Sequence, residues 1–186
     1  RELAATLRPK NLLVTASVPA KTYDDKSSAH SGAFDYQAIA PYLDMVMIMT
    51  YDEHYAGGDP GPVASLPWVE KVINFTLKSF HPKKVVLGIA AYGYDWSLGK
   101  GKALQYNGIQ NLIKSQKIAP KWHSVYKVPY FTYKSWGVTH QVWYENSYST
   151  SYKADLVKKY GLKGVAVWRL GYEDPNIWSI LRQKLL

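Results

Sequence analysis

The sequence predicts an α/β fold built from repeated strand–helix units. Short apolar runs alternate with longer stretches that have the spacing or composition of helices. Runs that are apolar at every position are typical of strands buried on both faces of a parallel sheet. Such units leave two architectures, an open doubly wound sheet or a (β/α)8 barrel. No glycine-rich nucleotide fingerprint follows a strand, and this absence favours the barrel.

The apolar runs are the predicted strands. They span residues 12–18, 45–49, 84–90 and 164–168. Helices are expected between and after them, over 34–42, 67–80, 150–160 and the C-terminal residues. The second helix has Pro67 in its first turn, and apolar residues repeat at spacings of three and four from Val69 to Phe80. Gly161 ends the third helix.

Residues 98–147 break this rhythm. Segments that alternate apolar and polar residues, 128–133 and 139–144, surround a helical stretch near 108–117. Period-two alternation is typical of half-buried antiparallel strands. We therefore expect a small α+β insertion here.

Composition indicates a globular domain without a membrane span. The chain has 186 residues, of which 47% are hydrophobic and 20% charged, and no apolar run reaches the roughly 18 residues that a span needs. It has no cysteine and a net charge of +9, which suits an anionic partner such as nucleic acid or an acidic cell-wall polymer. The basic residues are scattered and no nucleic-acid motif accompanies them, so we expect no nucleic-acid partner.

Carboxylates and aromatic residues coincide at the ends of three predicted strands, over 49–54, 92–96 and 168–174. Barrel enzymes carry their functional groups at these strand ends. Carboxylates among aromatic rings suit glycoside hydrolysis, because a cationic sugar centre needs nearby acids and sugar faces need apolar platforms. The alternative is that each carboxylate caps a helix or pairs with Lys or Arg. Likewise, many of the 7 Trp and 16 Tyr residues could simply form the core.

Four segments together resemble glycoside hydrolase family 18. They are Asp44–Asp52, the Gly-Gly-Asp-Pro-Gly-Pro-Val loop at 57–63, Leu87–Trp96 and Gly164–Gly171. The resemblance is closest to the bacterial branch associated with spore cortex and peptidoglycan lysis. It implies that residues 1–186 are the C-terminal half of a (β/α)8 TIM barrel, strands five to eight, with the insertion at 98–147 between strands seven and eight.

The resemblance also implies site residues for substrate-assisted catalysis. In this family the 2-acetamido oxygen of an N-acetylglucosamine unit attacks its own anomeric carbon. By resemblance, Tyr51 donates a hydrogen bond to the acetamido group, Asp52 orients the sugar and tunes the electrostatics, and Met49 lines the same subsite.

Aromatic residues at the other strand ends are the predicted sugar contacts. Trp168 is expected to be the platform under the reacting sugar, the alternative being a plug in the barrel core. Tyr92 and Trp96 are further expected contacts. Many family members have Tyr-Gly-Arg where this chain has Tyr92-Gly93-Tyr94, which leaves a polar contact at Tyr94 open.

The family's acid motif, DxxDxDxE, has no match in the sequence. We expect the acid glutamate upstream of residue 1. We also expect residues 1–186 to need the N-terminal half of the barrel, because without that half two strand edges and an apolar interior would be exposed. Glu53 and Glu173 do not match the family's acid position. The five histidines show no metal-ligand spacing, so no metal and no cofactor are expected.

The sequence therefore predicts a glycosidase acting on β-1,4-linked N-acetylglucosamine polymers, peptidoglycan or chitin, with retention of configuration. The alternatives are a non-catalytic chitinase-like glycan-binding domain and an inactive structural fragment. The resemblance places such proteins outside the cell, in the cell wall or in the spore, although the chain itself carries no localisation signal.

Overall fold

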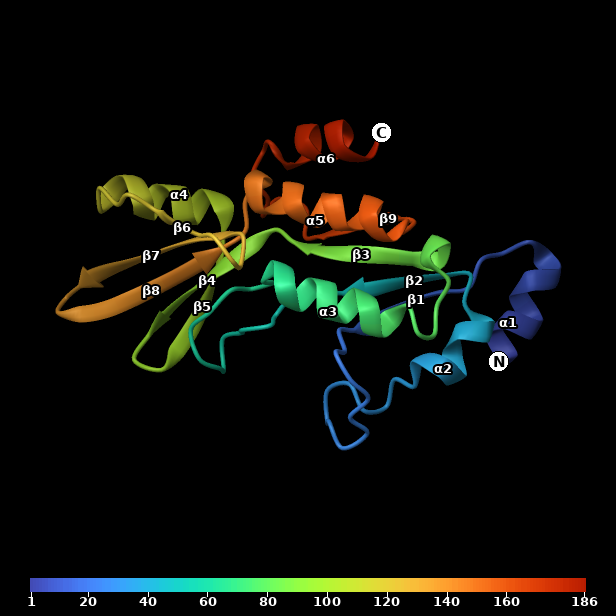
Figure 1. The fold of residues 1–186 in the computed structure, drawn as a ribbon. Coiled ribbons are helices and arrows are strands. Elements are labelled where there is room, and N and C mark those ends of the chain that lie inside the picture. The colour runs from blue at the N-terminus through green and yellow to red at the C-terminus, as the bar shows by residue number, and fades with distance from the viewer.

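A computed structural model describes residues 1–186, which form two sheets. A four-stranded parallel sheet has the order β1-β2-β3-β9, and a five-stranded antiparallel sheet has the order β5-β4-β8-β7-β6. They lie side by side along the long axis of the molecule (Figure 1), with β3 leading directly into β4. The parallel strands are β1 (Thr15–Pro19), β2 (Met45–Met49), β3 (Val85–Ala90) and β9 (Gly164–Trp168). The antiparallel strands are β4 (Tyr92–Ser97), β5 (Lys100–Gln105), β6 (Lys121–His123), β7 (Val128–Ser135) and β8 (Val138–Tyr144). The predicted α/β class is confirmed.

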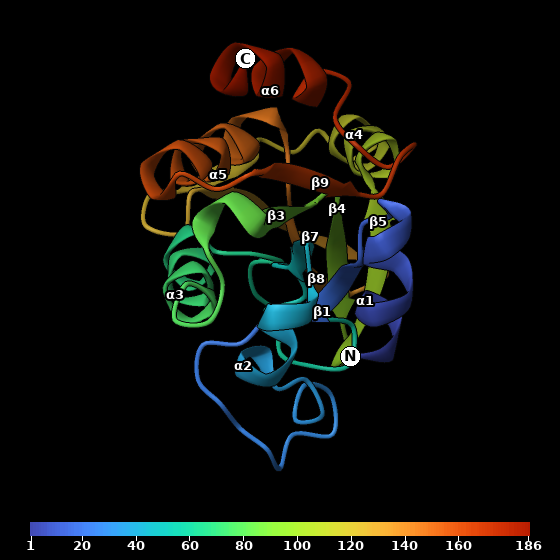
Figure 2. The ribbon, with the colours of Figure 1, turned by 90° about the vertical axis from the view of Figure 1, so that its right-hand side faces the viewer.

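Helices follow the strands in the expected alternation. They are α1 (Glu2–Leu7), α2 (Tyr36–Ile39), α3 (Leu66–Thr76), α4 (Tyr106–Ser115), α5 (Ser147–Tyr160) and α6 (Ile177–Leu185), with 3-10 turns at Arg8–Lys10, Ala40–Tyr42 and Pro82–Lys84. Viewed along the strands (Figure 2), α3 and α5 lie on the same side of the parallel sheet. None of the helices combines the length and apolar character needed to cross a bilayer.

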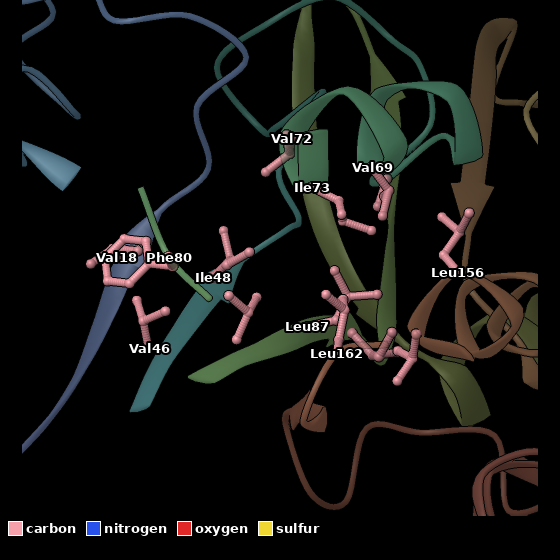
Figure 3. Close-up of a cluster of buried hydrophobic side chains, with 14 of the residues drawn as sticks. Val18, Val46, Ile48, Val69, Val72, Ile73, Phe80, Leu87, Leu156 and Leu162 are labelled. Atoms are coloured by element: carbon pink, nitrogen blue, oxygen red, sulfur yellow. The ribbon is translucent and has the colours of Figure 1, made fainter. Parts of the chain in front are cut away.

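The main core lies between the parallel sheet and its helices. Val46 and Ile48 of β2 and Leu87 of β3 point to this side, where they meet Ile73 of α3 and Leu156 of α5 (Figure 3). Each of these positions is almost completely buried, and burying one such aliphatic side chain contributes about 1.5–3 kcal/mol. These contacts fix the strand ends that carry the site.

The opposite face of the parallel sheet is only partly covered. The methionines of β2, Met45, Met47 and Met49, point to it and are half-buried, while Val46 and Ile48 between them are fully buried. Burial on both faces, predicted for these strands, is therefore found for β3 only, because β1, β2 and β9 each have residues that are half-buried or exposed. The reason is that no helix covers this second face.

Some predicted boundaries differ from the structure. The first strand begins at Thr15 rather than at residue 12, and Leu12 and Leu13 are exposed. The Asp44 side chain, which accepts a hydrogen bond from the Val14 backbone N–H, holds this approach to the sheet. The second sheet begins at Tyr92 rather than at residue 98, because β4 pairs with both β5 and β8.

Asp174 connects the starts of α5 and α6. Its carboxylate accepts hydrogen bonds from the backbone N–H of Ser147 (2.9 Å) and from the backbone (3.0 Å) and side chain (3.1 Å) of Asn176. Burial alone would raise the pKa of Asp174, but these hydrogen bonds outweigh it and hold that pKa below its ordinary value. The stabilisation is therefore present above the unfolded-state pKa and is lost as pH falls through the lower folded-state pKa.

Replacing Asp174 by Ala is expected to lower the free energy of unfolding at pH 7 by about 1–3 kcal/mol, because buried N–H groups lose their acceptor. Urea unfolding of the full-length protein at pH 7 and at pH 3 measures this. The difference from wild type should narrow at pH 3, and an equal difference at both pH values would contradict the assignment. Asp155→Ala, which removes an exposed pair with Lys184, is the matched control and should change little.

Candidate functional site

A cavity opens where β1 and β2 end. Its volume is about 540 Å³, and Pro19, Met49, Tyr51, Asp52 and Tyr55 are among the residues that line it. Small-molecule sites commonly have this size. Parallel strands bring their carboxyl ends to one edge of the sheet, which is why residues that follow different strands meet here.

Asp52 is held by two tyrosines of the second sheet. Its Oδ1 atom accepts hydrogen bonds from the hydroxyls of Tyr92 (2.6 Å) and Tyr94 (2.9 Å). The backbone of Asp52 has φ +61°, a left-handed conformation that Asp tolerates better than most residues. The loop after β2 and the first strand of the antiparallel sheet therefore fix one carboxylate together.

The three tyrosines near Asp52 remain protonated at neutral pH. Burial raises the pKa of Tyr92 far above its ordinary value, and the hydrogen bond to Asp52 and its charge raise it further. Burial and the Asp52 carboxylate likewise raise the pKa of Tyr94 and of Tyr51. Each hydroxyl is thus available as a hydrogen-bond donor.

Tyr51 lies beside this pair. Its ring meets the Tyr92 ring edge to face, with centroids 6.4 Å apart. Gly88 of β3 permits the close packing, since a Cβ there would lie 2.3 Å from the Ile48 carbonyl oxygen and 3.1 Å from the Tyr51 ring. The absence of a side chain at Gly88 therefore allows β2 and the Tyr51 ring to pack closely against β3.

The two other carboxylates near the strand ends have structural partners. Glu53 accepts hydrogen bonds from the backbone N–H (2.6 Å) and hydroxyl (3.0 Å) of Ser65, the N-cap of α3. Hydrogen bonds, first from its own backbone N–H, hold the pKa of Glu173 below its ordinary value. Glu173 therefore lacks the raised pKa of a carboxylic acid that donates a proton at neutral pH.

The predicted aromatic contacts occupy different environments. Trp168 ends β9 opposite Ala90 of β3 and has 54% of its surface exposed. Tyr92 is buried and reaches the cavity region through its hydroxyl. Trp96 is only 2% exposed, packs on the Tyr94 ring at 5.3 Å, and donates from its indole N–H to the Tyr55 carbonyl. This corrects the predicted sugar contact of Trp96, which lies beneath the site with no face open to a ligand.

The structure adds two residues to those predicted. Tyr94, whose contact was left open, donates to Asp52, and Tyr55, which was not singled out, lines the cavity and is 54% exposed. The period-two spacing of Tyr92, Tyr94 and Trp96 was the available signal, because it predicts a strand with these three rings on one face. No group of three or more His, Asp or Glu side chains is placed to hold a metal ion.

Comparisons with known proteins agree on one family. The family model for glycosyl hydrolases family 18 matches residues 1–173. The uncharacterized glycosylase YvbX of Bacillus subtilis is 38% identical over 97% of this chain and 54% of its own length. A chitinase structure from Chromobacterium violaceum aligns with TM-score 0.93 and 35% identity over 99% of this chain and 59% of its own.

The spore cortex-lytic enzyme SleL of Bacillus cereus aligns with TM-score 0.91 and 27% identity, over 100% of this chain and 44% of its own. The chain thus spans about half the length of the relatives it matches. The resemblance drawn from the strand-end segments is thereby confirmed, and the chain belongs to glycoside hydrolase family 18.

Proposed function

We propose that residues 1–186 are the C-terminal half of a (β/α)8 barrel, with β1, β2, β3 and β9 as strands five to eight. The parallel order of these strands and the helices on one face support this architecture. The half-buried methionine face of β2 then belongs to the barrel interior, and β1 and β9 are the edges that the N-terminal half would pair. The antiparallel sheet is the insertion before strand eight.

We propose that the full-length protein hydrolyses β-1,4 bonds next to N-acetylglucosamine. The observation that carries this proposal is the Asp52 carboxylate held by two tyrosine hydroxyls beside Tyr51, at the strand ends of a family 18 chain. Among its relatives are proteins named cortical fragment-lytic enzyme, chitinase and di-N-acetylchitobiase. Carbohydrate is the substrate class to which these names point.

The proposed reaction has two steps. The acetamido oxygen bonds to the anomeric carbon as the glycosidic C–O bond breaks, and an acid glutamate outside residues 1–186 protonates the leaving oxygen. Water then attacks the anomeric carbon, gives its proton to that glutamate and restores the acetamido group. The two displacements retain the configuration.

In this scheme the chain supplies stabilisation and positioning. The Tyr51 hydroxyl donates to the acetamido group, and the negative charge of Asp52 stabilises the cationic ring that the group forms. Met49 lines the subsite and Trp168 carries the sugar on its exposed face. Tyr92 and Tyr94 act as positioning residues for Asp52.

The net charge of +9 favours an anionic polymer, so peptidoglycan is the preferred substrate in this proposal and chitin the second. The rival function is a glycan-binding protein that keeps the cleft and lacks the acid. The encoded sequence before residue 1 separates them. A DxxDxDxE motif there supports the enzyme, and a substituted acid position supports the binding protein.

Tyr51→Phe in the full-length protein is expected to lower kcat on a soluble N-acetylglucosamine oligomer by about 10²-fold, because one donor to the developing charge is lost. Steady-state kinetics measure it, with thermal unfolding to show that the fold is kept. Tyr23→Phe, at an exposed tyrosine, is the control and should leave kcat unchanged. If Tyr51→Phe turns over as fast as wild type, Tyr51 does not have the proposed role.

A further inference from the structure

A second pocket lies on the antiparallel sheet, beside the loop that follows Asp52. We call it the flank pocket. It has a volume of about 320 Å³ and is lined by His54, Pro60 and Pro62 of the loop and by His123, Tyr126, Tyr130 and Trp143 of the antiparallel sheet and the turn before β7. None of the eight residues that line it carries a carboxylate, ammonium or guanidinium group. The flank pocket therefore has no permanently charged side chain, although the chain has a net charge of +9.

Two stacked ring pairs build its wall. His123 and Tyr126 stack with centroids 4.0 Å apart at 10°, and Trp143 and Tyr130 stack at 4.5 Å and 15°. Each ring is therefore held at a set angle before any ligand arrives. Rigid aromatic and proline rings in one pocket suit the C–H faces of a sugar, and they cost little conformational entropy on binding.

One hydrogen-bonding group of a residue that lines the flank pocket has no partner within the protein. The Nε1–H of Trp143, a residue that is only 7% exposed, is buried without an acceptor. Buried donors are normally paired, and an unpaired one costs about 1–3 kcal/mol. Trp143 is therefore a lining residue whose indole N–H has no hydrogen-bond partner in the protein.

The two histidines have defined tautomers when neutral. The Nδ1 atom of His123 accepts from the Tyr126 backbone N–H (3.1 Å), so its Nε2 carries the proton and can donate. The Nδ1 atom of His54 lies 3.0 Å from the Asp59 carbonyl oxygen, which can only accept, so its Nε2 has a free lone pair. The two histidines thus bring one N–H donor and one acceptor to the lining of the pocket, which complements an amide: a carbonyl oxygen and an N–H.

The flank pocket lies on the same face of the antiparallel sheet as Tyr94, which lines the cavity beside Asp52. Trp143 of β8 pairs directly with Tyr94 of β4, the residue that donates to Asp52, and with Tyr130 of β7. Directly opposed residues of an antiparallel pair point to the same face. The loop after Asp52, with His54 on the flank side and Tyr55 on the cleft side, lies between the two cavities.

We propose that the flank pocket binds a neutral N-acetylated sugar residue outside the reacting cleft. The choice of a glycan rests on the proposed function, whereas the choice of a neutral, amide-bearing ring rests on the pocket alone. Its occupant is a sugar of the polymer that is not being cleaved, so the pocket holds the enzyme on its insoluble substrate.

The test has a binding arm and a kinetic arm, both on the full-length protein. Titration of the ¹⁵N-labelled protein with the β-1,4 disaccharide of N-acetylglucosamine should shift the indole N–H signal of Trp143 and leave that of Trp136, a fully exposed residue of the turn between β7 and β8, in place. The unacetylated disaccharide cellobiose should bind more weakly, because it lacks the amide.

In the kinetic arm, His123→Ala and Tyr130→Ala are compared with Trp136→Ala. Both pocket variants should weaken binding to insoluble peptidoglycan or chitin about tenfold, as expected for loss of one aromatic contact. Turnover of a short soluble oligomer should stay within about twofold of wild type, since neither residue touches the cleft. Trp136→Ala should match wild type in both.

The outcomes separate this inference from the proposed function. An unshifted Trp143 signal, or pocket variants that bind the polymer as wild type does, would overturn the flank pocket whether or not the protein turns over its substrate. A shifted signal in a protein without turnover would support the flank pocket and contradict the enzyme. If a variant unfolds, the titration of the wild-type protein still decides.

Discussion

Replacing Asp52 by Asn in the full-length protein is expected to lower kcat by about 10²–10³-fold, the size of effect seen when one preorganised electrostatic group is removed. Asn keeps the shape of the side chain and an oxygen that can accept from the hydroxyls of Tyr92 and Tyr94. Only the negative charge disappears, so the loss reports stabilisation of the cationic intermediate rather than disruption of the loop. Steady-state turnover of a soluble N-acetylglucosamine oligomer measures it.

Asp59→Asn is the matched control for this experiment. Asp59 lies in the same loop, and it is the backbone oxygen of Asp59 that contacts His54. Turnover of this variant should equal that of wild type. The role of Asp52 is refuted if both variants are equally active, and a loss confined to KM would assign Asp52 to substrate binding alone.

The largest expected loss of stability comes from Lys153→Met. Lys153 of α5 and Glu145 form a buried ion pair, with side chains 2% and 1% exposed, and Ser149 donates a further hydrogen bond to the same carboxylate oxygen. Burial already raises the pKa of Glu145 against the opposing effect of Lys153. Without the ammonium group the carboxylate is left uncompensated, at a cost of about 3–5 kcal/mol in the free energy of unfolding.

A second substitution distinguishes loss of the pair from loss of packing. The double variant Glu145→Gln/Lys153→Met should recover most of the stability, since no uncompensated charge remains. Lys159→Met, which breaks an exposed pair with Glu70, should change little. Urea unfolding measures all three, and a double variant as unstable as Lys153→Met would show that packing, not charge, is responsible.

Sequence patterns located the parallel strands because their evidence is local. The runs over 45–49 and 84–90 consist almost entirely of consecutive apolar residues, and the structure has strands at Met45–Met49 and Val85–Ala90. The sequence could not predict which face of β2 is covered, since the exposure of Met45, Met47 and Met49 depends on which segments pack against that strand. An apolar run has the same composition whether one face of the strand or both faces are covered.

The candidate site was predictable in outline but not in detail. Asp52 and Tyr51 follow from their place after a buried strand and from the family resemblance. The partners of Asp52 lie 40 and 42 residues away, at Tyr92 and Tyr94, and only strand pairing brings them near. The burial of Trp96 was missed for the same reason, because the loop that covers it, around Tyr55, is distant in sequence.

The contact of Tyr92 and Tyr94 with Asp52 limits how the protein can be re-engineered. The antiparallel sheet looks like a module that could be exchanged among relatives to change the width of the groove. Its first strand, β4, however, carries both hydroxyl groups that hold the Asp52 carboxylate. A chimera that imports this sheet without tyrosines at these two positions should acquire a new wall together with a misplaced Asp52 side chain, so transplants should join the chain after Trp96.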